Sequence, residues 1–208
     1  LNTIFIHNRY FWVYFDDYKK IENDFRVPIF GLREGVKLEE RDQPLNQYHL
    51  LAKAGVRMPL LVRPGNSGIK DDKLKKILDD YFKKGGGPLV VKVSEALRTY
   101  ERAFFVITNS SEYFLFGKDL MGKGKITQEA LDKAVIEEFI IGAQVNFNYF
   151  YSTLTGELEL MGTDTRRQTS LDGFLRLNAN TQTALLRAGY KPTMIETGHI
   201  ACTTKESI

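Results

Sequence analysis

The clearest pattern of apolar and polar positions lies between Ile69 and Lys84. Its apolar residues recur at the i, i+3, i+4, i+7 and i+8 spacing of one helical face: Leu74, Ile77, Leu78, Tyr81 and Phe82. Lysines and aspartates fill most of the remaining positions, so the segment predicts an amphipathic helix. Three glycines at 85–87 follow, and we interpret them as the helix end and a turn rather than a phosphate-binding loop.

Other segments predict a mixture of helices and strands. Helices are expected at Glu34–Arg41, at Leu45–Ala54 before Gly55, at Ser110–Leu120 and from an N-cap at Thr127 to Ala134, whereas Ala179–Gly189 fits a helix or a loop. Strands are expected at Thr3–Ile6, Arg26–Gly31, Pro88–Val93, Ala103–Ile107, Val135–Gly142, Phe174–Leu177 and Met194–Thr203, with a hairpin formed by Gln144–Ser152 and Leu158–Asp164 around a turn at Thr155 and Gly156. The predicted fold class is α+β with largely antiparallel sheets.

Composition narrows the function classes. The chain has 208 residues, 43% apolar and 26% charged, and a net charge of +3, which gives no argument for nucleic acid as a partner. No apolar run is long enough to span a membrane. A single cysteine, Cys202, excludes an internal disulfide framework and is typical of a protein in a reducing cytoplasm. The chain begins within an apolar strand and ends without a terminal element, so we expect a fragment of a longer protein.

Charged residues inside two apolar strands are the first candidates for chemistry. Lys92 follows Val90 and Val91, where a phosphate would offset the cost of burying a cation; the alternative is an edge lysine that reaches water. Glu137 and Glu138 are neighbours in a strand, so they point to opposite faces and one must face the interior or a pocket. That carboxylate is suited to ribose hydroxyls, or alternatively to a salt bridge with a helix lysine.

Polar residues near the hairpin form a second group of candidates. Asn148 belongs to a strand face that carries three amides, and this face is either solvated or turned toward a cleft. Arg166 and Arg167 follow the hairpin and are suited to bidentate binding of phosphate or carboxylate, although a plain polar loop is the alternative. His199 lies beside Gly198, which permits close approach of a ligand, but a single histidine is more often structural.

The order of these features resembles the ATP-grasp superfamily, in which two α+β subdomains with antiparallel sheets clamp ATP. The strings IEEFIIG, FNYFYSTLTGELELMGTDTRR, LDGFLRL and TGHI, together with PIFGLR and LLAKAGVRMP, are similar to the archaeal formate-dependent synthetase of formaminoimidazole-carboxamide ribonucleotide. The resemblance extends over nearly the whole chain. It implies an ATP-dependent ligase of purine (IMP) biosynthesis that formylates aminoimidazole-carboxamide ribotide with formate through formyl phosphate.

The resemblance also implies roles for individual residues. Lys92 would contact phosphate, and residues 137–140 (Glu137, Glu138, Phe139 and Ile140) would contact adenine and ribose through side chains and backbone groups. Arg166 and Arg167 would be catalytic and Gln168 would bind the nucleotide, whereas Asn8, Tyr10, Asn148 and His199 would bind substrate. ATP chemistry of this kind uses Mg²⁺. We expect the Mg²⁺ ligands beyond Ile208.

Four places differ from the family pattern. The connection after the strand lysine, Ser94–Arg102, lacks the family's glycines, so Arg98 and Arg102 would have to substitute as cations. Asn8 to Tyr10 replace a His-Gly-Ser sequence, Gln168 replaces a glutamate, and His199 replaces an asparagine. These differences favour a divergent paralogue, with a different carboxylate or amine substrate or a non-catalytic nucleotide-binding or assembly role as the alternative functions.

The resemblance finally predicts how the chain is divided. Residues 1–31 would end an N-terminal α/β subdomain, and 32–62 would form a helical linker. Residues 63–140 would form the ATP-grasp subdomain with the strand lysine, and 141–208 would begin the second subdomain. We expect small-molecule substrates, no nucleic acid, no membrane, a homo-oligomer and a cytoplasmic location.

Overall fold

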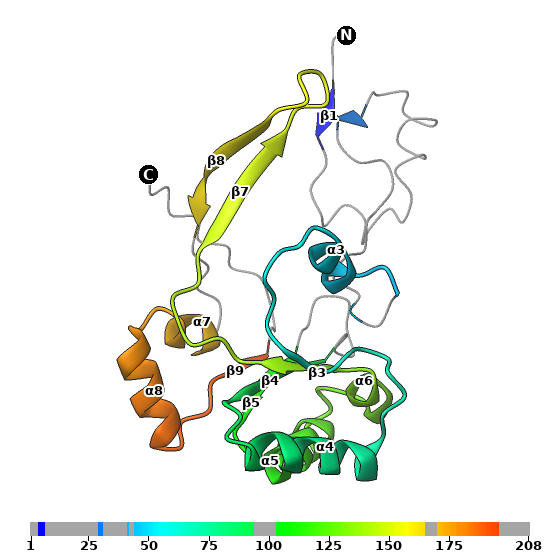
Figure 1. Cartoon of the computed structure of the whole chain (residues 1–208), viewed down its shortest axis with the longest axis vertical. Coiled ribbons are helices and arrows are strands. Elements are labelled where there is room, and N and C mark those ends of the chain that lie inside the picture. Colours follow the sequence, from blue (N-terminus) through cyan, green and yellow to red (C-terminus); the bar gives the residue numbers. More distant parts are fainter. Residues whose placement is uncertain are drawn as a thin grey trace.

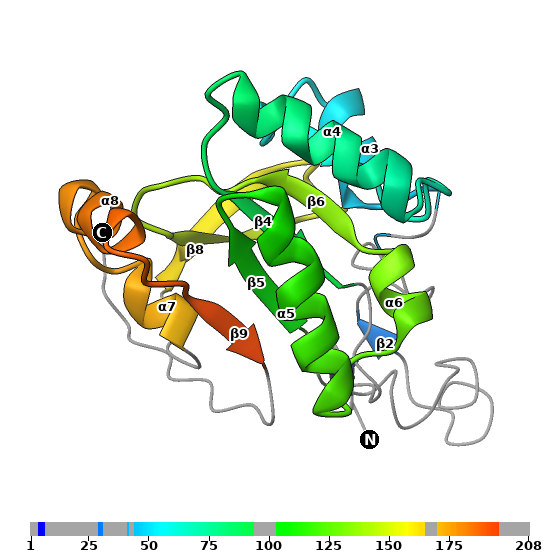
Figure 2. The ribbon, with the colours of Figure 1, turned by 90° about the horizontal axis from the view of Figure 1, so that it is seen from below.

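A computed structural model of the chain describes residues 4–6, 29–30, 41, 44–93, 103–164 and 170–195. Its centre is a five-stranded sheet with the strand order β3-β6-β4-β5-β9 (Figures 1 and 2). The strands are β3 (Leu61–Arg63), β4 (Leu89–Lys92), β5 (Ala103–Ile107), β6 (Val135–Glu138) and β9 (Thr193–Ile195). Every neighbouring pair in this sheet is antiparallel, as predicted.

Two smaller sheets accompany the central one. β1 (Phe5–Ile6) pairs in parallel with β2 (Ile29–Phe30). β7 (Asn146–Tyr151) and β8 (Leu158–Asp164) form the predicted antiparallel hairpin, which extends away from the central sheet (Figure 1). The turn residue Gly156 has φ +72°, a conformation that favours glycine. The described chain is therefore mixed α/β, with antiparallel pairing in the central sheet and in the hairpin.

One face of the central sheet is covered by α4 (Asp71–Lys83), α5 (Ser110–Gly122) and α6 (Gln128–Asp132). The main core lies here because alternate strand residues point to this face; it includes Leu74, Leu78, Leu89, Val91, Phe105, Ile107, Tyr113 and Ile136. The helix predicted from the 69–84 pattern is confirmed, and Leu74 and Leu78 of α4 are fully buried. Thr127 caps α6 as predicted, since its hydroxyl accepts a hydrogen bond from Ala130 N.

The opposite face is covered in part by α7 (Ser170–Phe174) and α8 (Ala179–Arg187). Leu171, Phe174 and Leu186 pack there against Val90 and Val106. The predicted strand at 174–177 is wrong, because Leu171 and Phe174 are buried at helical i, i+3 spacing. The segment 179–189, for which helix and loop were both open, is helical from 179 to 187.

The linker between β6 and β7 is attached to α8 by a fully buried glutamine. Gln182 donates hydrogen bonds to the carbonyl oxygens of Gly142 (3.0 Å) and Leu177 (2.7 Å) and accepts one from Gly142 N (3.2 Å). Its side-chain amide thus satisfies backbone groups that regular secondary structure leaves unpaired. None of the described helices has the length and apolar character needed to cross a bilayer.

Candidate functional site

The two charged strand residues predicted from the sequence meet on the second face of the sheet. In the antiparallel register, Glu137 on β6 lies opposite Val90 on β4, and Lys92 lies opposite Val135. The side chains of Lys92 and Glu137 therefore project from the same face and form an ion pair through Nζ and Oε1. The Glu137 side chain is only 4% exposed and that of Lys92 is 21% exposed. Lys92 is therefore only partly exposed to water, and Glu137 pairs with this strand lysine rather than with a helix lysine.

A tyrosine from a separate helix completes the hydrogen bonding of Glu137. Helix α3 (Gln47–Lys53) begins at Asn46, whose side chain accepts hydrogen bonds from Tyr48 N and His49 N. Tyr48, in the first turn, donates from Oη to Glu137 Oε2 at 2.5 Å. Burial, and then the neighbouring Glu137 carboxylate, raise the pKa of Tyr48 well above its ordinary value. The hydroxyl therefore keeps its proton and acts as the donor.

A second cation lies beside this pair. The Arg41 guanidinium carbon is 5.2 Å from the centre of the Phe104 ring, and Lys92 Nζ is 5.8 Å from the centre of the same ring. Arg41 is 5% exposed, and its Nε has no hydrogen-bond partner among the described residues. Asn46 Nδ2 donates to the carbonyl oxygen of Arg41 at 3.1 Å, which ties this residue to the start of α3.

We call Arg41, Tyr48, Lys92, Phe104 and Glu137 the strand-lysine cluster. It contains two cations, one carboxylate and a neutral tyrosine, so its formal charge is positive. A positively charged, largely buried cluster on an aromatic ring favours an anion, because opposite charges interact strongly where water is scarce. Its chemistry fits a phosphate or carboxylate group better than a neutral ligand.

The residues after Glu137 have separate roles in the structure. Glu138 is partly exposed, and its Oε2 accepts a hydrogen bond from Leu60 N at 3.3 Å. Phe139 N donates to Pro88 O at 2.9 Å. The expected contact of the Phe139 and Ile140 backbone with an adenine edge stays a prediction. The Phe139 side chain belongs to the second core beside Phe174. Ile140, in contrast, is 54% exposed.

The remaining candidates are not joined to this cluster in the described structure. Asn148 is an exposed residue of β7 in the projecting hairpin, so its cleft-facing role stays a prediction. The other candidates lie outside the described residues: Asn8, Tyr10, Arg166, Arg167, Gln168 and His199. The glycine-free connection 94–102 also lies outside them.

Sequence reasoning missed three members of the cluster. Arg41 was assigned only to the end of a helix, Tyr48 only to a helix and Phe104 only to a strand. Phe104 does carry a signal, because it alternates with Ala103 and Phe105 and must face away from the main core. Arg41 and Tyr48 carry none that points to Glu137, since 89 residues separate Tyr48 from Glu137.

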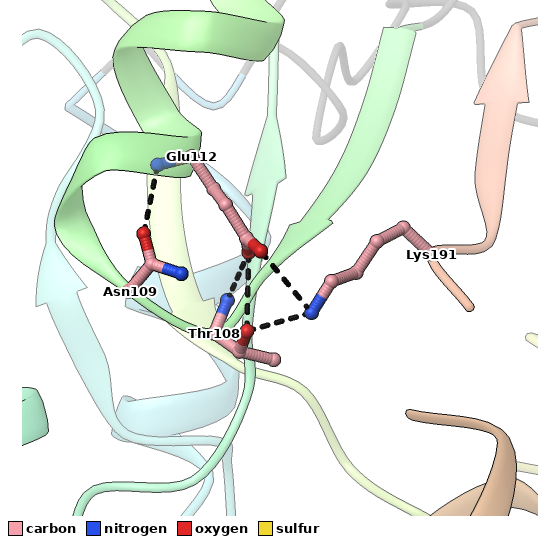
Figure 3. Close-up of polar contacts among 4 residues, drawn as sticks. All are labelled: Thr108, Asn109, Glu112 and Lys191. Atoms are coloured by element: carbon pink, nitrogen blue, oxygen red, sulfur yellow. Dashed lines mark hydrogen bonds and ion pairs between the residues drawn. The ribbon is translucent and has the colours of Figure 1, made fainter. Parts of the chain in front are cut away.

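A second polar cluster lies at the start of α5 (Figure 3). Asn109 caps the helix by accepting from Glu112 N, and Glu112 Oε2 in turn accepts from Thr108 N at 2.7 Å. Lys191 Nζ donates to Thr108 Oγ1 at 2.6 Å and lies 3.4 Å from Glu112 Oε1. This is a reciprocal helix cap with a lysine from the segment before β9. Its groups satisfy one another, so the cluster has a structural explanation.

Metal ligands are not assembled in the described part of the chain. No group of three or more histidine, cysteine, aspartate or glutamate side chains comes together there. The described residues therefore do not fit a magnesium site by themselves, and we assign no step to a metal ion.

Two family descriptions match the chain. Residues 1–62 match one described as "Protein of unknown function (DUF1246)", and residues 112–208 match one described as "Domain of unknown function (DUF1297)". Neither description names an activity.

Curated proteins resemble the chain over most of its length. It is 30% identical over 188 residues to the 5-formaminoimidazole-4-carboxamide-1-(beta)-D-ribofuranosyl 5'-monophosphate synthetase of Methanocaldococcus jannaschii. It is 32% identical over 189 residues to the synthetase of the same name from Methanococcus vannielii, and 30% identical over 188 residues to that from Methanopyrus kandleri. Each match covers 90% of this chain, but only 45%, 45% and 46% of the respective relatives. The chain thus spans about half the length of these relatives.

Proposed function

Because the chain belongs to the family of the archaeal 5-formaminoimidazole-4-carboxamide ribonucleotide synthetases, we propose that it serves the same reaction. The reaction is an ATP-dependent formylation of aminoimidazole-carboxamide ribotide in purine biosynthesis, with formate activated as formyl phosphate. The names of the relatives favour this activity over a paralogue with another substrate. Since the chain spans about half of these relatives, the activity of the whole protein is a proposal.

The observation that carries this proposal is the ion pair between Lys92 and Glu137 on the central sheet. We propose that the sheet belongs to an ATP-grasp fold and that Lys92 contacts phosphate groups of ATP. The arrangement supports this role because Lys92 keeps 21% of its side chain exposed while its charge is held by Glu137. A phosphate approaching from the open side would meet an ammonium group that is already oriented.

The neighbouring groups would then have distinct tasks. Glu137 holds the Lys92 ammonium through Oε1, and Tyr48 fixes the carboxylate through Oε2. Glu137, Glu138, Phe139 and Ile140 remain proposed contacts of the ribose and adenine. Bound ATP supplies the phosphoryl group that activates formate. Arg166, Arg167 and Gln168, which follow β8, remain proposed contacts of the phosphates, and Asn8, Tyr10, Asn148 and His199 remain proposed substrate contacts.

We also propose the division predicted from the sequence: an N-terminal subdomain end at 1–31, a linker at 32–62 and ATP-grasp parts at 63–140 and 141–208. We propose further that the protein is a cytoplasmic homo-oligomer and uses Mg²⁺ with ATP.

The direct test measures the affinity of the purified chain for ATP by isothermal titration calorimetry. Lys92→Met should weaken ATP binding by at least about tenfold, because one charge-assisted hydrogen bond contributes roughly 1.5–3 kcal/mol. Lys123→Met, which removes an exposed lysine of a helix-surface pair, is the matched control and should bind as the unmodified chain does. Equal ATP affinity in all three proteins would contradict the proposed site.

Turnover provides the second measurement. ADP should form only when formate and the ribotide are both present, and ADP formation with another acid in place of formate would favour a paralogue. ATP binding without turnover in any acid would favour a nucleotide-binding or assembly subunit.

A further inference from the structure

Arg41 is a buried cation that the proposed function leaves unused. Arg41 is 5% exposed, and its Nε has no hydrogen-bond partner within the part of the chain that the structure describes. Among the described residues, no carboxylate forms an ion pair with it. Burying a guanidinium with an unsatisfied donor is costly, so such a residue calls for a specific explanation.

The one carboxylate of the cluster is engaged with other residues. Glu137 Oε1 pairs with Lys92, and Glu137 Oε2 accepts from Tyr48. The contact of Arg41 with the Phe104 ring at 5.2 Å is favourable but satisfies no hydrogen bond. Within the described residues the cluster therefore contains one more cation than carboxylates, and no acceptor reaches the Arg41 Nε–H.

Arg41 shares an aromatic ring with the proposed phosphate lysine. The Arg41 guanidinium and the Lys92 ammonium contact the same ring, so they cannot be farther apart than the sum of 5.2 and 5.8 Å. The positive charge of Arg41 also acts on the Tyr48 hydroxyl, where it opposes the effect of Glu137. Arg41 comes from the segment before α3, whereas Lys92 comes from β4, so the two cations would hold an anion between separate parts of the chain.

We infer that Arg41 is an anion-binding residue of the strand-lysine cluster and that its unpaired Nε receives a phosphate oxygen. The guanidinium supplies planar donors that an ammonium lacks, which suits it to grip phosphate. This inference deepens the proposed function and rests on it for the identity of the ligand. The phosphate can come from the nucleotide or from the 5′-phosphate of the ribotide, since both present the same chemistry.

The test compares Arg41→Met with Arg187→Met, in which an exposed arginine of α8 is replaced. Binding of ATP, pyrophosphate, the ribotide and adenosine is measured by calorimetry at constant ionic strength. Arg41→Met should weaken binding of the phosphate ligand by about tenfold or more and leave adenosine binding unchanged, because adenosine carries no phosphate. A loss confined to ATP and pyrophosphate assigns Arg41 to the nucleotide; a loss confined to the ribotide assigns it to the substrate.

Thermal unfolding without ligand separates binding from a structural role. An anion-binding Arg41 is unsatisfied in the free chain, so Arg41→Met should keep or raise the unfolding temperature. A structural Arg41 predicts a lower one. If Arg41→Met does not fold, Arg41→Gln takes its place, and failure of both to fold would overturn the inference in favour of a structural role.

The outcomes separate this inference from the proposed function. ATP binding that depends on Lys92 but not on Arg41 overturns the inference and leaves the function standing. Pyrophosphate or ribotide binding that depends on Arg41, in a chain that does not bind ATP, supports the inference and overturns the proposed ATP site. A chain that binds none of the four ligands overturns both.

Discussion

Replacing Lys92 by methionine tests the buried ion pair most directly. Methionine preserves most of the length and the apolar stem of lysine but removes the ammonium that pairs with Glu137. Among the described residues, Glu137 then keeps only the hydrogen bond from Tyr48. A carboxylate with a 4% exposed side chain cannot recover its lost partner from water.

The magnitude follows from the burial of the two partners. Removing one member of a buried pair costs roughly 3–5 kcal/mol. Lys92 is 21% exposed, so its pair is not fully desolvated and we expect the lower end, about 3 kcal/mol. The converse change, Glu137→Gln, leaves Lys92 able to turn toward water and should cost less, about 1–2 kcal/mol. We expect this difference in cost between the two substitutions because Lys92 is partly exposed and Glu137 is buried.

Urea unfolding followed by far-ultraviolet circular dichroism measures both changes. With a slope of about 2 kcal/mol per molar urea, a loss of 3 kcal/mol lowers the midpoint by about 1.5 M. The double variant Lys92→Met with Glu137→Gln removes the unpaired charge, so the two losses should not add, and the coupling should be about 2 kcal/mol. Lys123→Met breaks an exposed pair with Asp119 and should cost at most about 0.5 kcal/mol.

Two results would refute the reasoning about this pair. A midpoint shift for Lys92→Met as small as that for Lys123→Met would mean that Glu137 does not depend on Lys92. Fully additive losses in the double variant would mean that the two side chains do not interact in solution.

Two further predictions concern buried polar groups on the two faces of the sheet. Burial and then Glu137 raise the pKa of Tyr48 in the folded chain, whereas an unfolded tyrosine titrates near about pH 10. The protonated hydroxyl therefore stabilises the folded chain fully below about pH 10, and this contribution to the free energy of unfolding is lost as the pH rises above that value. Tyr48→Phe should lower stability by about 1.5–3 kcal/mol at pH 7 and flatten the alkaline decline, and an unchanged slope of stability against pH above about 10 would contradict this assignment. Arg63 is 1% exposed and donates to the carbonyl oxygens of Leu131 (2.7 Å) and Ala134 (3.0 Å). Arg63→Met should therefore lower the free energy of unfolding, measured in urea, by about 3 kcal/mol or more. A loss below about 1 kcal/mol would show that water replaces these hydrogen bonds.

The sequence predicted those parts of the fold whose signal is local. Helix α4 was predicted because one face of a single helix carries its apolar residues, and the hairpin because two alternating segments flank a glycine turn. Gly55 was placed after a helix, and its φ of +68° explains why a glycine ends α3 there. The strand predicted at 174–177 was wrong because a run of three or four residues is too short to distinguish the two-residue period of a strand from the 3.6-residue period of a helix.

The candidate site was predictable only as far as strand alternation reaches. Alternation showed that Glu137 or Glu138 must face inward, and this holds for Glu137, which is 3% exposed. For Lys92 the sequence left a phosphate partner and an edge position open. That Lys92 and Glu137 satisfy each other could not be derived, because it depends on the antiparallel register of β4 against β6. β5, α5 and α6 lie between these two strands in the chain, so their register is set by the packing of the whole domain.

The third partner shows why a helical pattern alone cannot identify a site residue. Tyr48 lies on the buried side of α3, where any large side chain would have matched the pattern. Only the position of the helix against the sheet distinguishes a tyrosine that fills space from one that donates to a buried carboxylate. The same positioning brings Arg41 to the Phe104 ring, so the segment before β3 contributes a donor and a cation to the strand-lysine cluster. A phosphate bound there would therefore connect that segment to the central sheet, and removing the phosphate should destabilise both the segment and the sheet.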